Sequence, residues 1–282
     1  MYRFLRFPDG KPKAVTLSYD DGSKFDIQLR EILDKYKIKC TFNISSRMLG
    51  DEFHLTADKV KTELFEKGHE IAVHGAHHMA PGQSRPIEGI QDVLECRKDL
   101  EKLLGCIVRG MAYPNCGITR MENGDSYGNI RTYLKNLDIA YERTLGGDND
   151  LFRLPTDWYA WMPTAHHNNP QIFEYIKKFT EFDPSKAYWS DRGARLFYLW
   201  GHSFEFGNDN SWDRLEKICE GLGGKADTWY ATNMEIYNYV NAYLSLVYSA
   251  DGKTVYNPSL LTVWFETDNG VYSVKSGETI TL

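Results

Sequence analysis

Short apolar runs alternate with helical patterns along most of this 282-residue chain. The runs are rich in Val, Ile, Phe, Tyr or Trp, which is typical of strands, and helices are predicted where apolar residues recur at helical spacing. Alternation of this kind forms a parallel sheet, and its seven repeats favour a distorted (β/α) barrel of about seven parallel strands over an open sheet. The strands are predicted at 14–19, 39–44, 70–74, 107–113, 138–143, 195–201 and 227–232, and the helices at 23–36, 56–67, 86–104, 126–136, 170–180, 211–222 and 233–246.

The pattern changes near Ser249. Residues 250–282 contain closely spaced turn signals, such as Asp251-Gly252 and Asn257-Pro258, with strand-like runs between them. Turns of this composition join antiparallel strands. Because no linker separates this segment from the rest, we expect an α/β barrel over residues 1–249 and a small C-terminal antiparallel β extension over 250–282 that packs on it.

Charge and composition argue against several classes of protein. The net charge is −6 and no basic run stands out, which argues against a nucleic-acid partner. No apolar run approaches the roughly 18 residues of a membrane-spanning helix. The five cysteines include no C-x-x-C pair, and the N-terminus lacks an apolar signal core. We therefore expect a cytoplasmic protein with no membrane partner, and the oligomeric state is left open.

Polar side chains follow four of the predicted strands. Asp20-Asp21, the segment from His74 to His78, Tyr113-Pro114 and His202 each lie at a carboxyl end. In barrels of this class the chemistry gathers at the face that those ends form. The four clusters together predict one active site at that face.

The carboxylates and histidines at this face suggest a metal. Two adjacent carboxylates at the end of a buried strand are costly unless something compensates their charge. Asp21, His74 and His78 offer one carboxylate and two imidazoles, and three such ligands with an open fourth position describe a catalytic divalent-metal site. Zn²⁺ is the first choice for this set, and Co²⁺, Ni²⁺ or Mn²⁺ would also suit it. Asp20 is then left as a carboxylate beside the metal-bound water.

His202 is a further candidate catalytic residue, because it ends the strand predicted at 195–201. Asp157 lies in a stretch without a helical pattern, 154–167. A carboxylate in that stretch could orient His202 and raise its pKa.

The same stretch contains three closely spaced aromatic residues, Trp158, Tyr159 and Trp161. At least one of them is expected to line a substrate pocket, and the alternative is that they fill a gap in the core. It also contains His166-His167. This pair is compatible with substrate contact, a second metal site or loop structure.

With these motifs, the chain resembles the polysaccharide deacetylases of carbohydrate esterase family 4, which share the NodB homology domain. The resemblance runs from about residue 10 to about residue 235. The family's T-F-D-D-G motif appears as Ser18-Tyr19-Asp20-Asp21-Gly22, and its H-[ST]-x-x-H motif appears as His74-Gly75-Ala76-His77-His78. Asp157-Trp158 resembles the fourth motif, and the strand that ends in His202 resembles the fifth.

The third motif departs most from the family pattern. The usual R-P-P-Y-G aligns through Pro114, which puts Ala112 where the family has an arginine that steadies the base aspartate. Arg109 is displaced by three residues. Arg143 and Arg153 are candidates to replace the missing arginine.

The resemblance implies a metal-dependent hydrolase that removes N-acetyl, possibly O-acetyl, groups from a sugar or oligosaccharide. Asp20 would be the base and His202 the acid. Tyr113, Pro114 and Asn115 would contact the substrate, and a backbone N–H near Asn115 would stabilise the oxyanion. Two alternatives stay open: an amidase acting on a non-sugar amide or cyclic imide, and a non-catalytic carbohydrate-binding relative.

Overall fold

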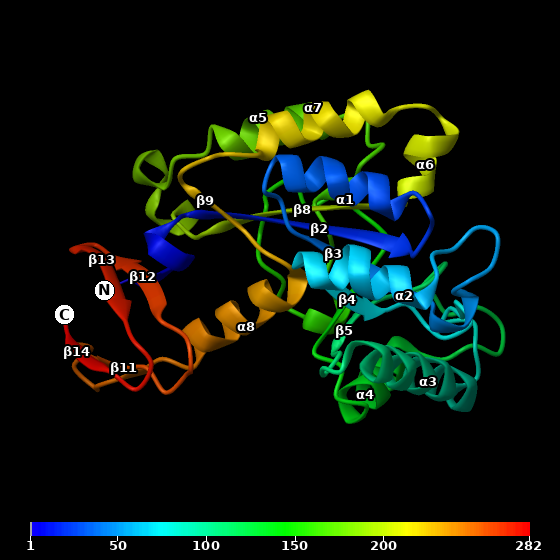
Figure 1. Ribbon diagram of the computed structural model, residues 1–282. Coiled ribbons are helices and arrows are strands. Elements are labelled where there is room, and N and C mark those ends of the chain that lie inside the picture. The colour runs from blue at the N-terminus through cyan, green and yellow to red at the C-terminus, as the bar shows by residue number, and fades with distance from the viewer. Residues whose placement is uncertain (1) are drawn as a thin grey trace.

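A curled parallel sheet forms the centre of the molecule in this computed structural model, which describes residues 2–282 (Figure 1). The described residues place seven strands in the order β6-β5-β4-β3-β2-β8-β7, and β9 also pairs with β2. All of these pairs are parallel, which confirms the predicted (β/α) barrel. The strands are β2 (Lys13–Asp21), β3 (Cys40–Ile44), β4 (Glu70–Val73), β5 (Gly110–Ala112), β6 (Tyr141–Arg143), β7 (Ala165–His166), β8 (Arg195–Gly201) and β9 (Thr228–Tyr230).

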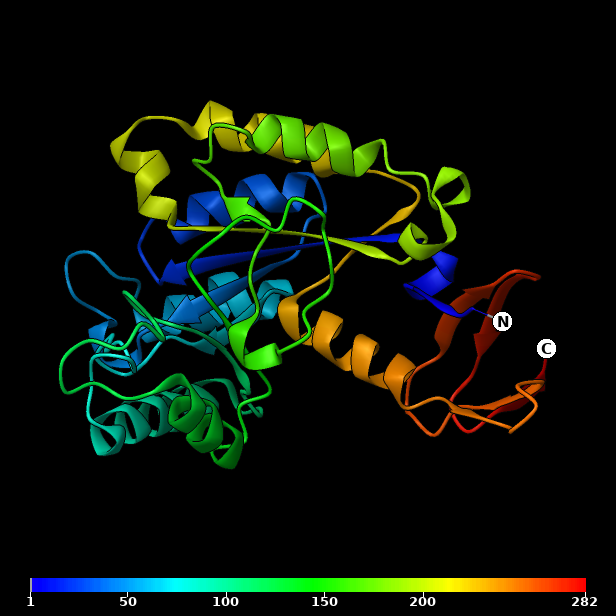
Figure 2. The same cartoon turned by 180° about the vertical axis from the view of Figure 1, so that it is seen from behind.

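Helices surround the strands on the outside of the sheet (Figures 1 and 2). They are α1 (Asp26–Lys35), α2 (Ala57–Lys59), α3 (Pro86–Leu104), α4 (Tyr127–Asn136), α5 (Ile172–Thr180), α6 (Ser203–Asn208), α7 (Trp212–Leu222) and α8 (Asn233–Leu244). The segment predicted as a helix over 56–67 is α2 followed by a π-helical turn and a 3₁₀ turn. Within the barrel, the strand β7 and the α-helix α6 were not predicted, because each is too short to show a period.

The helix ends follow from local chemistry. Pro86 opens α3 at a position where its missing N–H costs nothing, and Gly105 ends that helix with φ of 72°. In α8 the side chains of Thr232 and Glu235 each bond to the other's backbone N–H. These signals explain why the predicted bounds of both helices lie close to the observed ones.

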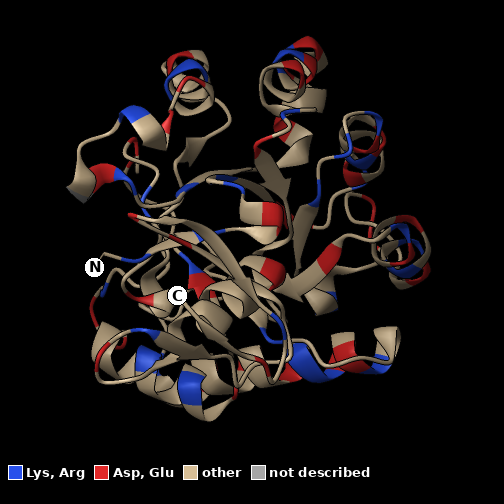
Figure 3. Ribbon diagram, turned by 90° about the vertical axis from the view of Figure 1, so that its left-hand side faces the viewer, with Lys and Arg blue, Asp and Glu red and all other residues tan. Residues whose placement is uncertain are grey.

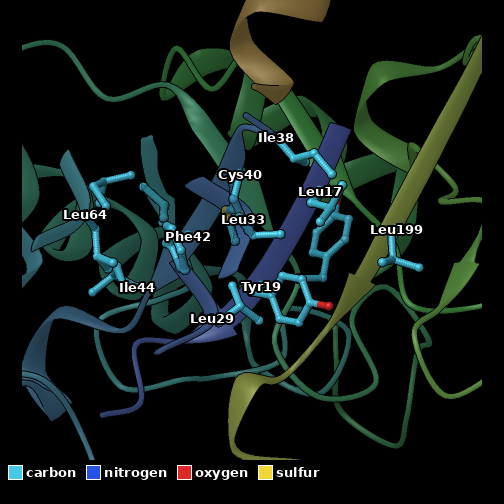
Figure 4. Packing of buried hydrophobic residues seen from close by; sticks show 14 of the residues in the cluster. Leu17, Tyr19, Leu29, Leu33, Ile38, Cys40, Phe42, Ile44, Leu64 and Leu199 are labelled. Carbon is cyan, nitrogen blue, oxygen red and sulfur yellow. The ribbon is translucent and has the colours of Figure 1, made fainter. Parts of the chain in front are cut away.

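Alternation along β2 separates core residues from site residues. Leu17 and Tyr19 point toward the helices, where Leu29 and Leu33 of α1 belong to the same buried cluster as these residues and Val15 (Figure 4). The intervening side chains point to the other face of the strand, since successive residues of a strand alternate. That other face is polar near its carboxyl end, where Ser18 bonds to Asn43 of β3 at 2.7 Å. The strand therefore carries Asp20 into the interior of the curled sheet.

The segment before β7 joins the two ends of the sheet. Trp161 forms a parallel bridge with Arg143 of β6, and its N–H donates to the carbonyl of Glu142 at 2.9 Å. A few residues later, β7 pairs with β8, with Ala165 opposite Leu199. This closure brings β6 next to the strands that carry Asp20 and His202.

Antiparallel strands form a separate layer at the far end of α8 (Figures 1 and 2). One sheet joins β1 (Phe4–Arg6), β12 (Val263–Thr267) and β13 (Gly270–Val274), and the other joins β10 (Val247–Tyr248), β11 (Thr254–Tyr256) and β14 (Thr279–Thr281). The hydroxyl of Tyr239 in α8 connects this layer to the helix, because it donates to the carbonyl of Arg6 and accepts from the N–H of Trp264. A division of the chain at residue 249 stays a prediction, and the N-terminal strand β1 belongs to the same layer as the tail.

Charges of both signs are interspersed on the outward faces of the helices (Figure 3). Among the described residues, no helix is both long and apolar enough to cross a membrane.

Candidate active site

Asp21, His74 and His78 come together at the carboxyl ends of β2 and β4. The Nε2 atoms of His74 and His78 lie 3.4 and 3.2 Å from Oδ1 of Asp21. Asp21 and His78 have left-handed backbone conformations, with φ of 80° and 58°, which turn the chain sharply after each strand. The three side chains form a group whose ligand atoms are close enough to share one metal ion.

The hydrogen bonding of His74 shows that a cation fits this group. Its Nδ1 lies 2.8 Å from the carbonyl oxygen of Ala112 and must donate, since a carbonyl only accepts. A neutral ring then has a lone pair on Nε2, which faces Oδ1 of Asp21. That oxygen is buried and has no hydrogen-bond donor. Facing lone pairs repel unless a cation lies between them, and bonds of about 2.0–2.1 Å to a tetrahedral zinc give ligand separations of about 3.3 Å.

Asn115 supports His78 from the loop after β5. Its side-chain amide lies 3.0 Å from the carbonyl oxygen of His78 and 3.3 Å from Nδ1 of the ring. The amide nitrogen donates to that carbonyl, and a half turn of the amide would bring its oxygen against the carbonyl oxygen instead. Asn115 thereby holds the loop that carries His78, whose Nε2 faces Oδ1 of Asp21.

The structure explains why glycine occupies position 75, in the loop between His74 and His78. Gly75 has φ of 75°, and a Cβ at this position would collide with Oδ2 of Asp92 in α3. The carboxylate of Asp92 accepts from the backbone N–H groups of His77 at 2.7 Å and Met79 at 3.4 Å. Asp92 therefore supplies the support that a hydroxyl at position 75 would give, and the loop keeps its shape.

Asp20 is buried next to the group formed by Asp21, His74 and His78, and its carboxylate accepts from two donors. Asn43 donates to its Oδ1 at 2.8 Å, and Arg143 of β6 forms an ion pair with its Oδ2. The guanidinium of Arg143 is itself buried and lies over the ring of Trp200, 4.4 Å from its centre. Oδ2 of Asp20 is 4.0 Å from Nε2 of His74.

The arginine that steadies Asp20 is therefore Arg143. The other two candidates are engaged at the surface: Arg109 pairs with Asp138 at 3.3 Å, and Arg153 pairs with Asp191 at 2.6 Å. The sequence could not choose among them, because the pair joins residues 123 positions apart.

His202 lies on the other side of Asp20, but its partner is not the predicted one. Its Nε2 is 4.0 Å from Oδ2 of Asp20, and its Nδ1 is 2.9 Å from Oε1 of Glu205. The expectation that Asp157 orients His202 is corrected: Asp157 accepts from the Tyr127 hydroxyl at 2.6 Å and caps the turn at Trp158–Ala160. Glu205 was not singled out from the sequence, although its spacing of three residues from His202 at a helix start was a usable signal.

A cavity of about 470 Å³ lies between the segments that follow β5 and β6. Tyr113, Cys116, Thr144 and Met162 are among the residues that line it. Of the predicted substrate contacts, Tyr113 therefore faces a cavity, Pro114 is buried in the same turn, and Asn115 is exposed.

Trp158 and Trp161 were expected to contact the substrate, and the structure places them elsewhere. Trp161 is 1% exposed and packs on Tyr141 and Tyr198 in a second core cluster. Trp158 packs edge-on against Trp161 and Tyr237. Ala160 and Met162, the two neighbours of Trp161, line the cavity instead, because successive residues of the extended chain at Trp161 point in opposite directions.

Trp161→Ala is expected to lower the free energy of unfolding by about 3–5 kcal/mol, the usual cost of deleting a fully buried aromatic side chain. Urea denaturation measures this loss, and Trp158→Ala, at a half-buried position, should cost less. A stable Trp161→Ala protein with a raised KM would mean that the indole contacts substrate after all.

Comparison with known proteins relates the chain to one family and to one fold. Residues 8–141 match the family model described as polysaccharide deacetylase. A search of the curated proteins finds no match. The fold is shared with a Mycobacterium smegmatis protein assigned to the polysaccharide deacetylases, at 16% identity and a TM-score of 0.58, over 85% of this chain and 94% of that one. It is also shared with the chitin deacetylase of Colletotrichum lindemuthianum, at 17% identity and a TM-score of 0.50, over 82% and 89%.

A third structure is similar over a shorter length. The match to Streptococcus pyogenes deacetylase PplD, in complex with acetate, covers 46% of this chain and 55% of that chain, at 20% identity and a TM-score of 0.41. The chain thus spans about half of that protein. The family match and the shared fold confirm the resemblance seen in the motifs.

Proposed function

We propose that this chain, which carries a polysaccharide deacetylase domain matched over residues 8–141, is a metal-dependent hydrolase that removes N-acetyl groups from a sugar or oligosaccharide. The observation that carries the proposal is the position of Asp20 and His202. Each lies within reach of the group formed by Asp21, His74 and His78, and their facing atoms are 4.0 Å apart. A non-catalytic binding protein has no use for a buried carboxylate and an imidazole arranged in this way.

The residues divide the work of amide hydrolysis. A divalent metal held by Asp21, His74 and His78 would polarise the acetyl carbonyl and make a water more acidic. Asp20 accepts a proton from the attacking water, and Arg143 and Asn43 hold its carboxylate in place. His202 donates a proton from Nε2 to the departing nitrogen. The backbone N–H near Asn115 stabilises the developing negative charge on the carbonyl oxygen.

The electrostatics support His202 as the acid. Burial lowers the pKa of His202, but the hydrogen bond that its ring donates to Glu205 and the charges of Asp20 and Asp21 outweigh it, so the pKa is raised above its usual value. The ring therefore keeps its proton to higher pH than a free imidazole.

The proposal also names a metal ion, a substrate class and a cellular compartment. Zn²⁺ suits two imidazoles and a carboxylate best, with Co²⁺, Ni²⁺ and Mn²⁺ as alternatives. The partner is an N-acetylated carbohydrate, and O-acetyl groups are a second class of substrate. All five cysteines are free, which favours a reducing compartment such as the cytoplasm.

Acetate release tests the proposed activity. The metal-loaded protein is incubated with N-acetylated oligosaccharides, O-acetylated sugars, simple amides and cyclic imides, and acetate or ring opening is measured. Acetate from N-acetyl sugars, lost on chelation and restored by metal, supports the proposal. Turnover of the imides alone would contradict the deacetylase assignment. If none of the four substrate classes were turned over, the proposal that this protein is an enzyme would be contradicted.

His202→Ala is expected to lower kcat by about 10²–10⁴-fold on amides, which is the usual worth of a general acid. The loss on acetyl esters should be smaller, because an alkoxide leaves with less help from a proton than an amine does. Rates on a matched amide and ester provide the comparison, and the metal content should not change. Equal losses on both substrates would show that His202 is not the acid for the leaving group.

A further inference from the structure

A second group of side chains near the site has the composition of a metal site. His166, His202 and Glu205 offer ligand atoms within 4.8 Å of one another. The carboxylate of Glu205 lies at the centre of the group. Its Oε1 is 2.9 Å from Nδ1 of His202, and its Oε2 is 3.3 Å from Nε2 of His166 and 2.8 Å from Nε2 of His167. The side-chain amide of Asn168 also donates to Oε2, at 3.0 Å.

The hydrogen bonds of His166 argue against a metal in this group. The backbone N–H of Asn168 donates to Nδ1 of His166 at 3.1 Å, so Nδ1 carries a lone pair. The proton of the neutral ring is then on Nε2, which faces Glu205. A protonated ring nitrogen cannot bind a metal. In His74 the arrangement is the reverse, since a carbonyl holds the proton on Nδ1 and leaves Nε2 bare.

His167 is built into the core beside Glu205. Its ring stacks on Tyr19 and Phe206, and burial lowers its pKa to about 4, so the ring is neutral at working pH. A side chain at Gly201 would collide with this ring, and glycine therefore allows β8 to approach it. His166 ends β7, and His167 and Asn168 directly follow it, which places all three as a fixed support beside Glu205 of α6.

We propose that Glu205 is the positioning residue for His202: it holds Nδ1 of the ring so that Nε2 faces Asp20, and the segment His166–Asn168 holds Glu205 in place. This inference rests on the proposed function, in which His202 gives its proton from Nε2. The role predicted for Asp157 from the sequence thus belongs to a carboxylate three residues after His202. The cluster orients a proton donor and holds no second metal.

The groups that face His202 come from three elements. Glu205 faces it from α6, Asp20 and Asp21 from β2, and His166 from β7 with ring centres 6.2 Å apart. Several anions therefore favour the imidazolium, but Glu205 is the one that bonds to Nδ1. Replacing it changes both the charge and the orientation of the ring, and two variants can separate these effects.

Nitrogen NMR of the zinc-loaded protein, labelled with ¹⁵N in its eight histidines, tests the proposal without depending on activity. The His202 signals are assigned by their absence in His202→Ala. In Glu205→Gln an amide oxygen can still accept from Nδ1, so the tautomer should persist while the pKa of His202 falls by about one unit or more. In Glu205→Ala the pKa should fall and the neutral ring should become a mixture of tautomers. An unchanged pKa and tautomer in both variants would overturn the proposal.

Kinetics and metal content complete the test. The two Glu205 variants should lose kcat with little change in KM, and Glu174→Gln, an exposed change on α5, should match the parent protein. If the parent protein bound a second zinc that Glu205→Gln lost, the cluster would be a metal site and the proposal would be wrong. A parent protein without deacetylase activity would contradict the proposed function alone, because the NMR result would still stand.

Discussion

Replacing Asp21 with alanine is expected to leave the protein without bound metal and without activity. Residues that only support a metal ligand are worth about 10–100-fold in affinity, so the loss of a direct ligand should exceed about 100-fold. His78→Ala should behave in the same way, since its Nε2 lies 3.2 Å from Oδ1 of Asp21. Elemental analysis after dialysis measures the metal, and full occupancy in either variant would refute the assignment.

His77→Ala is the matched control for His78→Ala. The two residues are adjacent, but the ring of His77 is mostly exposed and pairs with Asp92 rather than with Asp21. Its removal should leave the metal content unchanged. In the parent protein the affinity should fall at acidic pH, because both imidazoles and the carboxylate must lose their protons before they bind a cation.

Asp20→Asn is expected to lower kcat/KM by about 10²–10⁴-fold while the metal content stays the same. The amide keeps the shape of the carboxylate but cannot accept a proton from water. Asp21, His74 and His78 are all still present, so the metal should be retained. Rates on an N-acetyl substrate and elemental analysis of the same sample make the two measurements. Loss of metal would show that Asp20 is a ligand, and near-normal activity would show that it is not the base.

A second variant controls for the effect of Asp20→Asn on stability, because Asp20 forms a buried ion pair with Arg143. Removing one member of a buried ion pair costs about 3–5 kcal/mol, since it leaves the other charge uncompensated. Asp20→Asn therefore leaves Arg143 without its counter-charge and is expected to lower the melting temperature. In the double variant Asp20→Asn/Arg143→Met the buried charge is gone, and stability should recover in part. The loss of activity should persist in the double variant, which would separate the missing base from misfolding.

The local pattern of the sequence determined the barrel and most of its active face. Each predicted strand and helix matches an observed one, because hydrophobic period and chain punctuation are properties of neighbouring residues. The same locality placed Asp20, Asp21, His74, His78 and His202 at strand ends, where a parallel barrel collects its polar groups. That these five residues lie at one face of the barrel follows from the parallel topology of its strands.

The tertiary structure alone decided which partners these residues have. Arg143 reaches Asp20 across 123 positions, and only the closure of the sheet through Trp161 brings β6 that near. Trp161 is a core residue because of the direction in which its extended segment points, which a lone aromatic cluster does not reveal. Glu205 replaces Asp157 beside His202 because a short helix turns it back onto the ring. Contacts between distant segments depend on the curvature of the sheet and on side-chain packing, and the spacing of residues along the chain predicts neither.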